Sequence, residues 1–226
     1  TQMNIMLLLA PQNFNVAETL IFPHHSDSSS FFIATVKSKS YLEEESDVSQ
    51  ILDISTLLQT EYKKWHIQSS LNLLMEQKPE KDNSHQLTRL FYPKFRAYRY
   101  FTHKNGYFFV KAKALGNSES LFSTVDFLQT NFTISSLFNN SKFIIRNQIS
   151  FGHIFIDDFS LFPFSMKYTL GGADSVRGLP PKSLKNGKSF LLNKNSVQLK
   201  SSQNTSFGVF YDTGYCKKES DKNETY

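Results

Sequence analysis

One glycine-rich stretch contains the residues whose types and spacing could do chemistry. A predicted strand ends in Leu170-Gly171-Gly172-Ala173-Asp174-Ser175-Val176-Arg177-Gly178, which presents a single arginine. Paired glycines tolerate positive φ and allow close backbone approach, which a larger side chain would block. Such a turn could cradle an anion. However, the Gly-Lys-Ser/Thr ending of a phosphate loop and the strand–helix unit of a dinucleotide site are both missing.

Other candidate catalytic or metal-binding residues lack the partners that such sites need. His24-His25 has neither the i,i+4 helical spacing nor the neighbouring carboxylates of a metal site. His153 near Asp157 and Asp158 imitates a catalytic cluster, but the chain has no Gly-x-Ser-x-Gly nucleophile turn. Cys216 is the only cysteine, which excludes an internal disulfide and a cysteine-based zinc site. We therefore expect no catalytic residue, no metal site, no cofactor and no enzymatic activity.

The elements that must position the arginine are predicted strands. From about Phe91 onward apolar and polar residues alternate with a period of two. Lys104-Asn105-Gly106 and Asn139-Asn140-Ser141 are typical of hairpin turns, because Asn and Gly tolerate positive φ. The alternating segments are Tyr107–Leu115, Lys142–Phe151, Phe162–Leu170 and Ser206–Tyr215. They predict sequential hairpins in an up-and-down meander.

The two faces of these strands differ strongly. One face is aromatic, and the other carries charged, amide and hydroxyl groups. A soluble sandwich would bury the apolar face, whereas a membrane barrel would turn it to lipid and line a wet lumen with the polar face. The pattern alone leaves both architectures open.

The chain divides into three regions by pattern. Residues 1–90 are predicted to hold early strands and loops, residues 91–215 the alternating strands with a loop at 171–188, and residues 216–226 a polar tail. In the first region, Ser30–Lys37 and Ile67–Met75 resemble strands, while Val48–Trp65 partly fits both a helical stripe and a strand. Glu43–Asp47 and Gln77–His85 are predicted loops.

Composition and charge favour a β-rich protein over a nucleic-acid-binding one. The chain has 22 Phe and 10 Tyr against one Trp, as expected of strands with an aromatic surface. Its 25 Lys and Arg are spread beside 20 acids without a dense basic block, which argues against a nucleic-acid partner. No secretory signal and no apolar run of ~20 residues are visible. Barrel strands need only about 9–11 residues of alternating character, so a membrane location stays open.

These motifs resemble the superfamily of outer-membrane assembly factors and two-partner-secretion transporters. Its members carry a "GG..SVRG" segment in a loop that folds back into the barrel lumen, and a nearby strand with "F.D.G". The first motif is matched by Gly171, Gly172, Ser175, Val176, Arg177 and Gly178, and the second by Phe210, Asp212 and Gly214. Ser183–Lys188 and Leu191–Leu199 are similar to the loop end and next strand of the secretion branch. Leu179 departs from the family pattern, which has an aromatic residue there.

The resemblance implies an all-β fold, an up-and-down antiparallel transmembrane β-barrel present in part, with about 10–13 strands in this chain. It implies that residues 1–90 hold early barrel strands and loops, and that residues 91–215 form the barrel with an inward loop at 171–188. It also implies a bacterial outer-membrane location, with an organelle outer membrane as a second choice. The partners would be unfolded client polypeptides and the lipid bilayer, with periplasmic modules outside this chain. Neither a nucleotide nor a cofactor would be needed, and a client strand could add to a sheet edge.

The residue pattern and the resemblance lead to the same contact. Alternation places Asp212 on the polar face of its strand, opposite Phe207, Val209 and Tyr211. An arginine on an inward loop could therefore reach Asp212 and bind it through two hydrogen bonds. In a wet lumen we expect this pair to contribute only about 1 kcal/mol, so it would position the loop rather than stabilise the barrel.

Three alternatives remain at the level of sequence. Within the superfamily, the short interval from Arg177 to Asp212 favours secretion over assembly of other membrane proteins. A soluble β-rich binding module, with the apolar faces forming a core, is the second possibility. The third is a barrel domain attached to an enzyme outside this chain.

Overall fold

The computed structural model describes residues 2–10, 13–23, 31–42, 48–79, 85–118, 122–200 and 205–218. Within these ranges the regular structure is thirteen strands and two short 3₁₀ helices, η2 (Phe159–Leu161) and η3 (Phe164–Met166). The strands are β1 (Gln2–Ala10), β2 (Asn13–Pro23), β3 (Phe31–Leu42), β4 (Val48–Tyr62), β5 (Trp65–Pro79), β6 (His85–His103), β7 (Gly106–Asn117), β8 (Phe127–Asn139), β9 (Phe143–Phe155), β10 (Tyr168–Leu170), β11 (Leu184–Gly187), β12 (Ser189–Lys200) and β13 (Ser206–Lys217). In the described part of the chain, no helix has the length and apolar character needed to cross a membrane.

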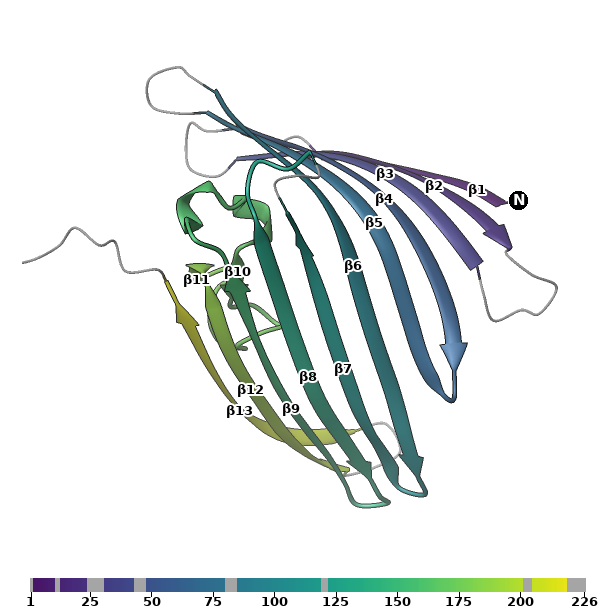
Figure 1. Ribbon diagram of the computed structural model, residues 1–226. Coiled ribbons are helices and arrows are strands. Elements are labelled where there is room, and N and C mark those ends of the chain that lie inside the picture. Colours follow the sequence, from purple (N-terminus) through teal and green to yellow (C-terminus); the bar gives the residue numbers. More distant parts are fainter. Residues whose placement is uncertain are drawn as a thin grey trace, which may run out of the picture. The chain divides into compact units, whose positions relative to one another are not determined.

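Eleven strands form one sheet whose order follows the chain. The order is β1 to β9, then β12 and β13, while β10 and β11 pair separately (Figure 1). β12 pairs antiparallel with β9 on one side and with β13 on the other, so Ser196 of β12 lies opposite Arg146 of β9 and Phe210 of β13. The predicted all-β, up-and-down antiparallel fold is confirmed, and thirteen strands lie within the expected number.

Tight turns connect the hairpins where the sequence supplies turn residues. Lys104 and Asn105 join β6 to β7, as predicted. At the next predicted turn, the Asn140 side-chain oxygen accepts hydrogen bonds from the backbone N–H groups of Lys142 (2.8 Å) and Phe143 (2.7 Å). This contact is an Asx turn, in which a short side chain replaces a backbone acceptor.

Sequence prediction was wrong at one strand. Phe162–Leu170 was predicted as a continuous strand, but its first part lies in and around η2 and η3, and only Tyr168–Leu170 is extended. Pro163 has no backbone N–H and cannot donate to a strand ladder. The alternation of Phe162, Phe164 and Met166 therefore belongs to a folded loop that imitates the strand period.

Several predicted element boundaries differ from those in the structure, and others lie outside the described residues. Val48–Trp65 is strand rather than helix, since β4 and β5 meet at a Lys63-Lys64 turn. The predicted loop Gln77–His85 is strand at both ends, and its residues 80–84 lie outside the described ranges. Glu43–Asp47, His24-His25 and residues 219–226 of the predicted tail also lie outside them. Cys216 and Lys217, assigned to that tail, belong to β13.

The chain forms two compact units. The first holds Thr1–Ala97, Ala114–Leu128 and Ile156–Ser165, and the second holds Tyr98–Lys113, Gln129–Phe155 and Met166–Tyr226. In the second unit, Leu170 and Val176 of the β9–β12 loop form a buried cluster with Phe190 and Leu192 of β12. We call the sheet surface beneath this loop the packed face.

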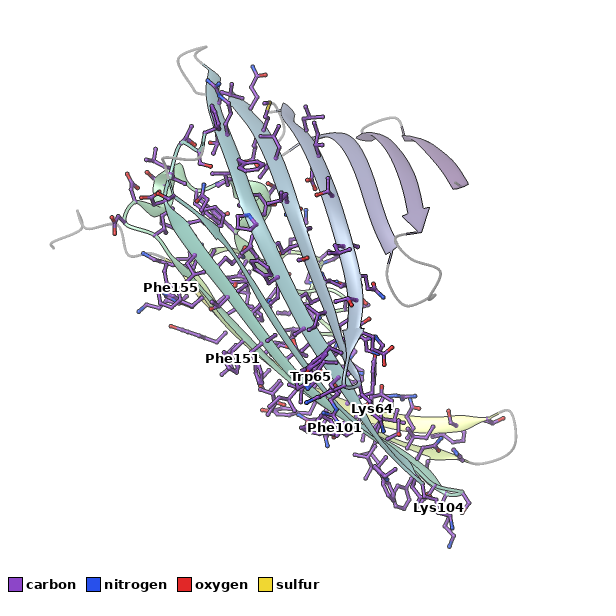
Figure 2. All side chains as sticks on the ribbon, turned by 45° about the vertical axis from the view of Figure 1, so that its right-hand side comes forward. Lys64, Trp65, Phe101, Lys104, Phe151 and Phe155 are labelled. Atoms are coloured by element: carbon purple, nitrogen blue, oxygen red, sulfur yellow. The ribbon has the colours of Figure 1, made fainter. Side chains whose placement is uncertain are left out.

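The opposite surface of the second unit's strands is apolar and uncovered. On β13, Val209 is 74% exposed and Tyr211 is 68% exposed. On β9, Phe151 is 50% and Phe155 53% exposed, and both are labelled in Figure 2. The alternation seen in the sequence therefore separates the packed face from an exposed apolar one, which we call the apolar face.

Candidate functional site

The connection between β9 and β12 folds back onto the sheet instead of forming an open turn. It contains the two-stranded β10–β11 hairpin, in which Tyr168 pairs with Gly187 and Leu170 with Leu184. Residues 171–183 form the tip beyond this hairpin. The tip is closed by backbone hydrogen bonds from Gly172 N to Leu179 O (3.0 Å) and from Ser175 N to Gly172 O (3.1 Å).

The motif glycines of the tip adopt conformations that other residues rarely adopt. The φ angles of Gly171, Gly172 and Gly178 are 120°, 89° and 92°. A Cβ atom on Gly171 would lie 2.3 Å from the carbonyl oxygen of Pro180. Glycine at position 171 thus allows both the backbone turn and its close packing.

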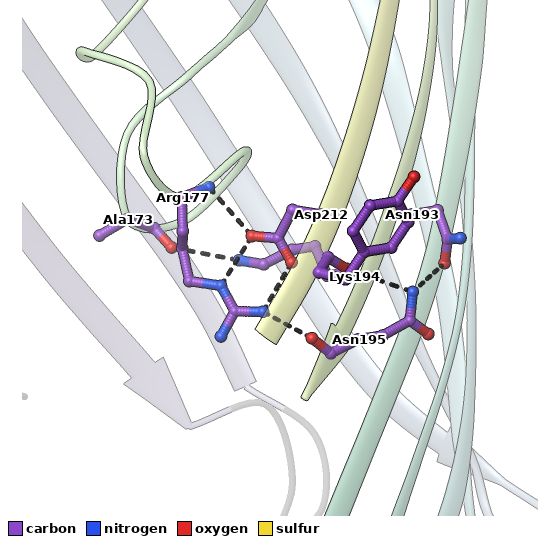
Figure 3. A network of polar contacts seen from close by, with 7 residues as sticks. Ala173, Arg177, Asn193, Lys194, Asn195 and Asp212 are labelled. Atoms are coloured by element: carbon purple, nitrogen blue, oxygen red, sulfur yellow. Dashed lines mark hydrogen bonds and ion pairs between the residues drawn. The ribbon is translucent and has the colours of Figure 1, made fainter. Parts of the chain in front are cut away.

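Arg177 and Asp212 meet through a forked pair of hydrogen bonds. The Arg177 Nε and Nη2 atoms donate to Asp212 Oδ2 (2.7 Å) and Oδ1 (2.6 Å) (Figure 3). The backbone N–H of Arg177 also donates to Oδ2, at 3.0 Å. We call this arrangement the latch. Three donors from one residue fix the loop tip against β13 in both position and orientation.

Groups on β12 and β13 also contact the Arg177 guanidinium or the loop beside it. Arg177 Nη2 donates to the backbone oxygen of Asn195 at 3.1 Å, and the guanidinium carbon lies 4.3 Å from the centre of the Phe210 ring. Lys194, opposite Asp212 in the β12–β13 register, donates to the backbone oxygen of Ala173 at 3.1 Å. The sequence assigned no role to Asn195 or Lys194, although strand register alone places Lys194 beside the carboxylate.

The latch is drier than expected on one side. The Asp212 side chain is 1% exposed, whereas the Arg177 side chain is 28% exposed. Hydrogen bonding to Asp212 raises the pKa of the Arg177 guanidinium above its ordinary value. The Asp212 side chain is therefore less accessible to water than a pair in a wet lumen would be. Removing the arginine would leave a buried carboxylate without its main partner, which costs more than losing a surface ion pair.

An apolar contact reinforces the latch. Val176 is buried, and a Cβ atom on Gly214 would lie 2.5 Å from its Cγ2 atom and 3.1 Å from Leu170 Cδ1. Gly214 therefore leaves room on β13 for the loop to reach the wall. Ser175, the remaining motif residue, has a buried hydroxyl oxygen without a hydrogen-bond partner in the structure.

An open pocket of about 230 Å³ with both polar and apolar lining lies beside the latch within the second unit. Its lining includes Arg146, Gln148, Arg177, Lys194 and Ser196. Arg146 donates to the side-chain oxygen of Gln198 at 2.9 Å. The packed face thus has an open pocket next to the loop that could hold water.

The residues that imitated a catalytic cluster have separate structural contacts. His153 Nδ1 lies 2.6 Å from the Ser189 hydroxyl, and Asp158 caps η2 by accepting from the backbone N–H of Ser160 at 2.9 Å. Among the described residues no group of three His, Cys, Asp or Glu side chains could hold a metal ion.

The antiparallel strand fold is shared with a solved structure. The structure is similar to the crystal structure of BamA from Haemophilus ducreyi lacking POTRA domains 1-3, with a TM-score of 0.77 and 11% sequence identity. The match covers 92% of this chain and 50% of that one, so the chain spans about half the length of the BamA chain. No model of a known protein family matches the sequence, and a search of curated proteins found no match either.

Proposed function

We propose that this chain is part of a bacterial outer-membrane β-barrel that secretes or inserts client polypeptides. In this proposal the loop tip lies in the lumen and is held to the wall by the latch. The observation that carries the proposal is the forked contact between Arg177 and the buried Asp212, on a loop folded back onto the sheet. No enzymatic step, nucleotide, cofactor or nucleic-acid partner is part of the proposed mechanism.

The apolar face supports a lipid partner. Phe207, Val209 and Tyr215 of β13 are 67%, 74% and 60% exposed, and they alternate with packed-face residues. Exposed apolar surface of this extent is unfavourable in water and favourable in a bilayer. We infer that β12 and β13 cross the outer membrane with this face toward lipid.

The latch suggests how client passage is coupled to barrel conformation. In this proposal a loop tip held by the latch, by the Lys194–Ala173 hydrogen bond and by the Val176 contact has two discrete arrangements, bound to the strands or released. A client strand that enters the lumen would compete for the same wall groups and shift the loop toward release. The clients would be unfolded or strand-forming polypeptides, and periplasmic modules outside this chain would deliver them.

Insertion of membrane proteins is the second candidate, beside secretion. The similarity to a BamA fold favours it, whereas the resemblance around Ser183–Leu199 favours secretion. Two client probes separate them in vesicles containing the full-length protein. An unfolded eight-stranded outer-membrane barrel tests insertion by its heat-modifiable gel shift, and a long extracellular β-helical polypeptide tests secretion by protease protection.

The latch is tested in the same vesicles by Arg177→Ala and Asp212→Asn. Both variants should lose most of the client activity while remaining folded by circular dichroism. Arg146→Ala is the matched control, because its guanidinium lies on the same packed face but binds the neutral Gln198. Normal client handling in both latch variants would exclude the proposed role.

A soluble β-rich binding module is the rival from another class. It would require a partner or a second layer over the apolar face. Extraction from cell membranes distinguishes the two: the barrel requires detergent, whereas the soluble module is released by carbonate buffer alone.

A further inference from the structure

A second contact fixes the β9–β12 connection to the sheet, within the first unit and independent of the latch. The carboxylate of Glu76, on β5, accepts hydrogen bonds from the backbone N–H groups of Phe164 (2.8 Å) and Ser165 (3.1 Å). It also accepts one from the Ser165 hydroxyl. Glu76 is only 3% exposed and lies 88 residues from Phe164 in the sequence.

Local structure explains why this segment needs an acceptor from outside. Short 3₁₀ turns leave their first N–H groups without partners inside the turn. Asp158 caps η2 by accepting from the N–H and hydroxyl of Ser160 at 2.9 and 2.6 Å. For η3, which begins at Phe164 immediately after Pro163, the corresponding cap comes from Glu76. A distant strand thus supplies the cap that the loop lacks.

Aromatic packing holds the same segment from its other side. Phe162 is 2% exposed and packs edge-on against Phe127, with ring centroids 5.1 Å apart. Phe127 in turn packs against Tyr92 at 5.8 Å, and Phe159 stacks on Phe162 at 6.1 Å. Burial of the Phe159 and Phe162 rings therefore stabilises the position of this segment.

We propose that Glu76 and this aromatic cluster make residues 159–166 a permanent anchor, and that loop movement is confined to the tip between Gly171 and Ser183. The inference that the tip moves rests on the proposed function, whereas the inference of a fixed anchor does not. Release of this segment would expose the buried Phe159 and Phe162 rings and also leave the Glu76 carboxylate without its donors, so this contact stays closed in both loop arrangements. The latch differs, because its arginine is 28% exposed and can exchange its contacts with water.

Contacts within the second unit also hold the segment between the anchor and the end of β10 in place. Gln129 donates to the backbone oxygen of Met166 at 3.1 Å. The Tyr168 hydroxyl donates to the backbone oxygen of Thr130 at 2.6 Å, and burial raises the pKa of Tyr168 to about 12, so it remains a donor. Beyond Leu170, the left-handed φ of 120° at Gly171 marks the point where the tip can pivot.

Spin labels at two matched positions test the anchor without any client. Leu161 in the anchor and Leu179 in the tip are each 40% exposed. In the full-length protein with Cys216→Ser, each is replaced by cysteine, labelled, and measured by electron paramagnetic resonance in lipid vesicles. Arg177→Ala should convert the Leu179 label to a mobile spectrum and leave the Leu161 label immobilised. Mobilisation of both labels by Arg177→Ala would overturn the proposal.

Changes at the carboxylate complete the test. Glu76→Ala should mobilise the Leu161 label, and Ser165→Ala, which removes one donor and spares the fold, should mobilise it in part. An unchanged Leu161 spectrum in both variants would exclude Glu76 as the anchor.

In the vesicle assay, a short thiol cross-link between Glu76→Cys and Ser165→Cys should leave client insertion intact. Loss of insertion on cross-linking would show that the arm must move, whereas absence of insertion in the parent protein would count against the proposed function alone.

Discussion

At the scale of single residues, the latch depends on geometry as well as charge. The planar guanidinium of Arg177 offers Nε and Nη2 to the two oxygens of Asp212, while its face covers the Phe210 ring. Lysine carries the same charge but cannot make the parallel fork or the planar stack. The position therefore selects arginine for its shape.

Conservative changes in the latch should separate these contributions. We expect Asp212→Asn to lower the free energy of unfolding by about 2–3 kcal/mol, because it removes a charged acceptor of three hydrogen bonds. Arg177→Lys should cost about half as much, since one ammonium contact survives. Denaturant unfolding in detergent micelles and a double-mutant cycle measure both terms. A coupling energy near zero would show that the two residues act separately.

Ser175 provides a contrasting prediction. Its hydroxyl is buried without a hydrogen-bond partner, so Ser175→Ala should leave stability unchanged or raise it by about 1 kcal/mol. The same unfolding measurement tests this expectation. A clear loss of stability would indicate that the hydroxyl bonds to an ordered water.

The sequence identified some residues of the site better than others. Arg177 and Asp212 could be paired because motif and strand alternation placed them on one side of one sheet. The low exposure of the Asp212 side chain could not be predicted, because its carboxylate oxygens are bound by three donors of Arg177 that reach them only when the loop folds onto the strand. Glu76 gave no local signal at all, since its partners lie 88 and 89 residues away.

At the scale of elements, small residues on the wall decide where the loop can dock. A Cβ atom on Gly152 of β9 would lie 2.5 Å from the Tyr168 hydroxyl, just as one on Gly214 would meet Val176. These two glycines leave space for the β10–β11 hairpin and for the tip. Glycine usually weakens a strand, so the close approach of a second segment accounts for its presence here.

Gly214→Ala tests the docking space. The added methyl group should cost about 1–3 kcal/mol of stability by overpacking and should partly release the tip. Val176→Ala in the same chain should restore part of the loss by vacating the contested volume. Limited proteolysis of residues 171–183 and thermal unfolding report the two effects. If Val176→Ala only adds to the damage, the clash is not the cause.

Strand prediction succeeded and failed for the same reason. A period of two reports that alternate residues face different surroundings, which holds for β7, β9, β12 and β13. It also holds for Phe162 and Phe164, but there a proline and two 3₁₀ turns create the alternation. Only the position of Pro163 could have signalled the difference.

At the scale of the whole molecule, the apolar face is the feature that decides its surroundings. A charge placed on that face should be tolerated in water and resisted in a bilayer. We expect Ile149→Lys, at the middle of β9 and 48% exposed before substitution, to destabilise the membrane-inserted protein by about 2–4 kcal/mol. The neighbouring Gln148→Lys, on the packed face beside the pocket, is the control and should cost far less. Equal stability of both variants in vesicles would contradict the lipid contact.

The overall architecture could be predicted, whereas its division could not. Hairpin turns and long alternating strands gave the antiparallel meander, and similarity to the BamA crystal structure agrees with that fold at 11% identity. The division into two compact units cuts through β6, β7 and β8, so neither a change in composition nor a turn in the sequence marks where it lies.

The single cysteine of the chain lies beneath the hairpin that carries the tip. Cys216 is half-buried, its sulfur is 3.7 Å from the Tyr168 oxygen, and a Cβ atom on Gly187 would lie 2.2 Å from it. The native protein therefore contains its own reporter of whether β10 and β11 rest on β13. Maleimide should modify this thiol slowly in the parent protein and in Arg177→Ala, but rapidly in Gly187→Val, where the new side chain displaces the hairpin. The kinetics of one labelling reaction would thus distinguish release of the tip from detachment of the entire connection.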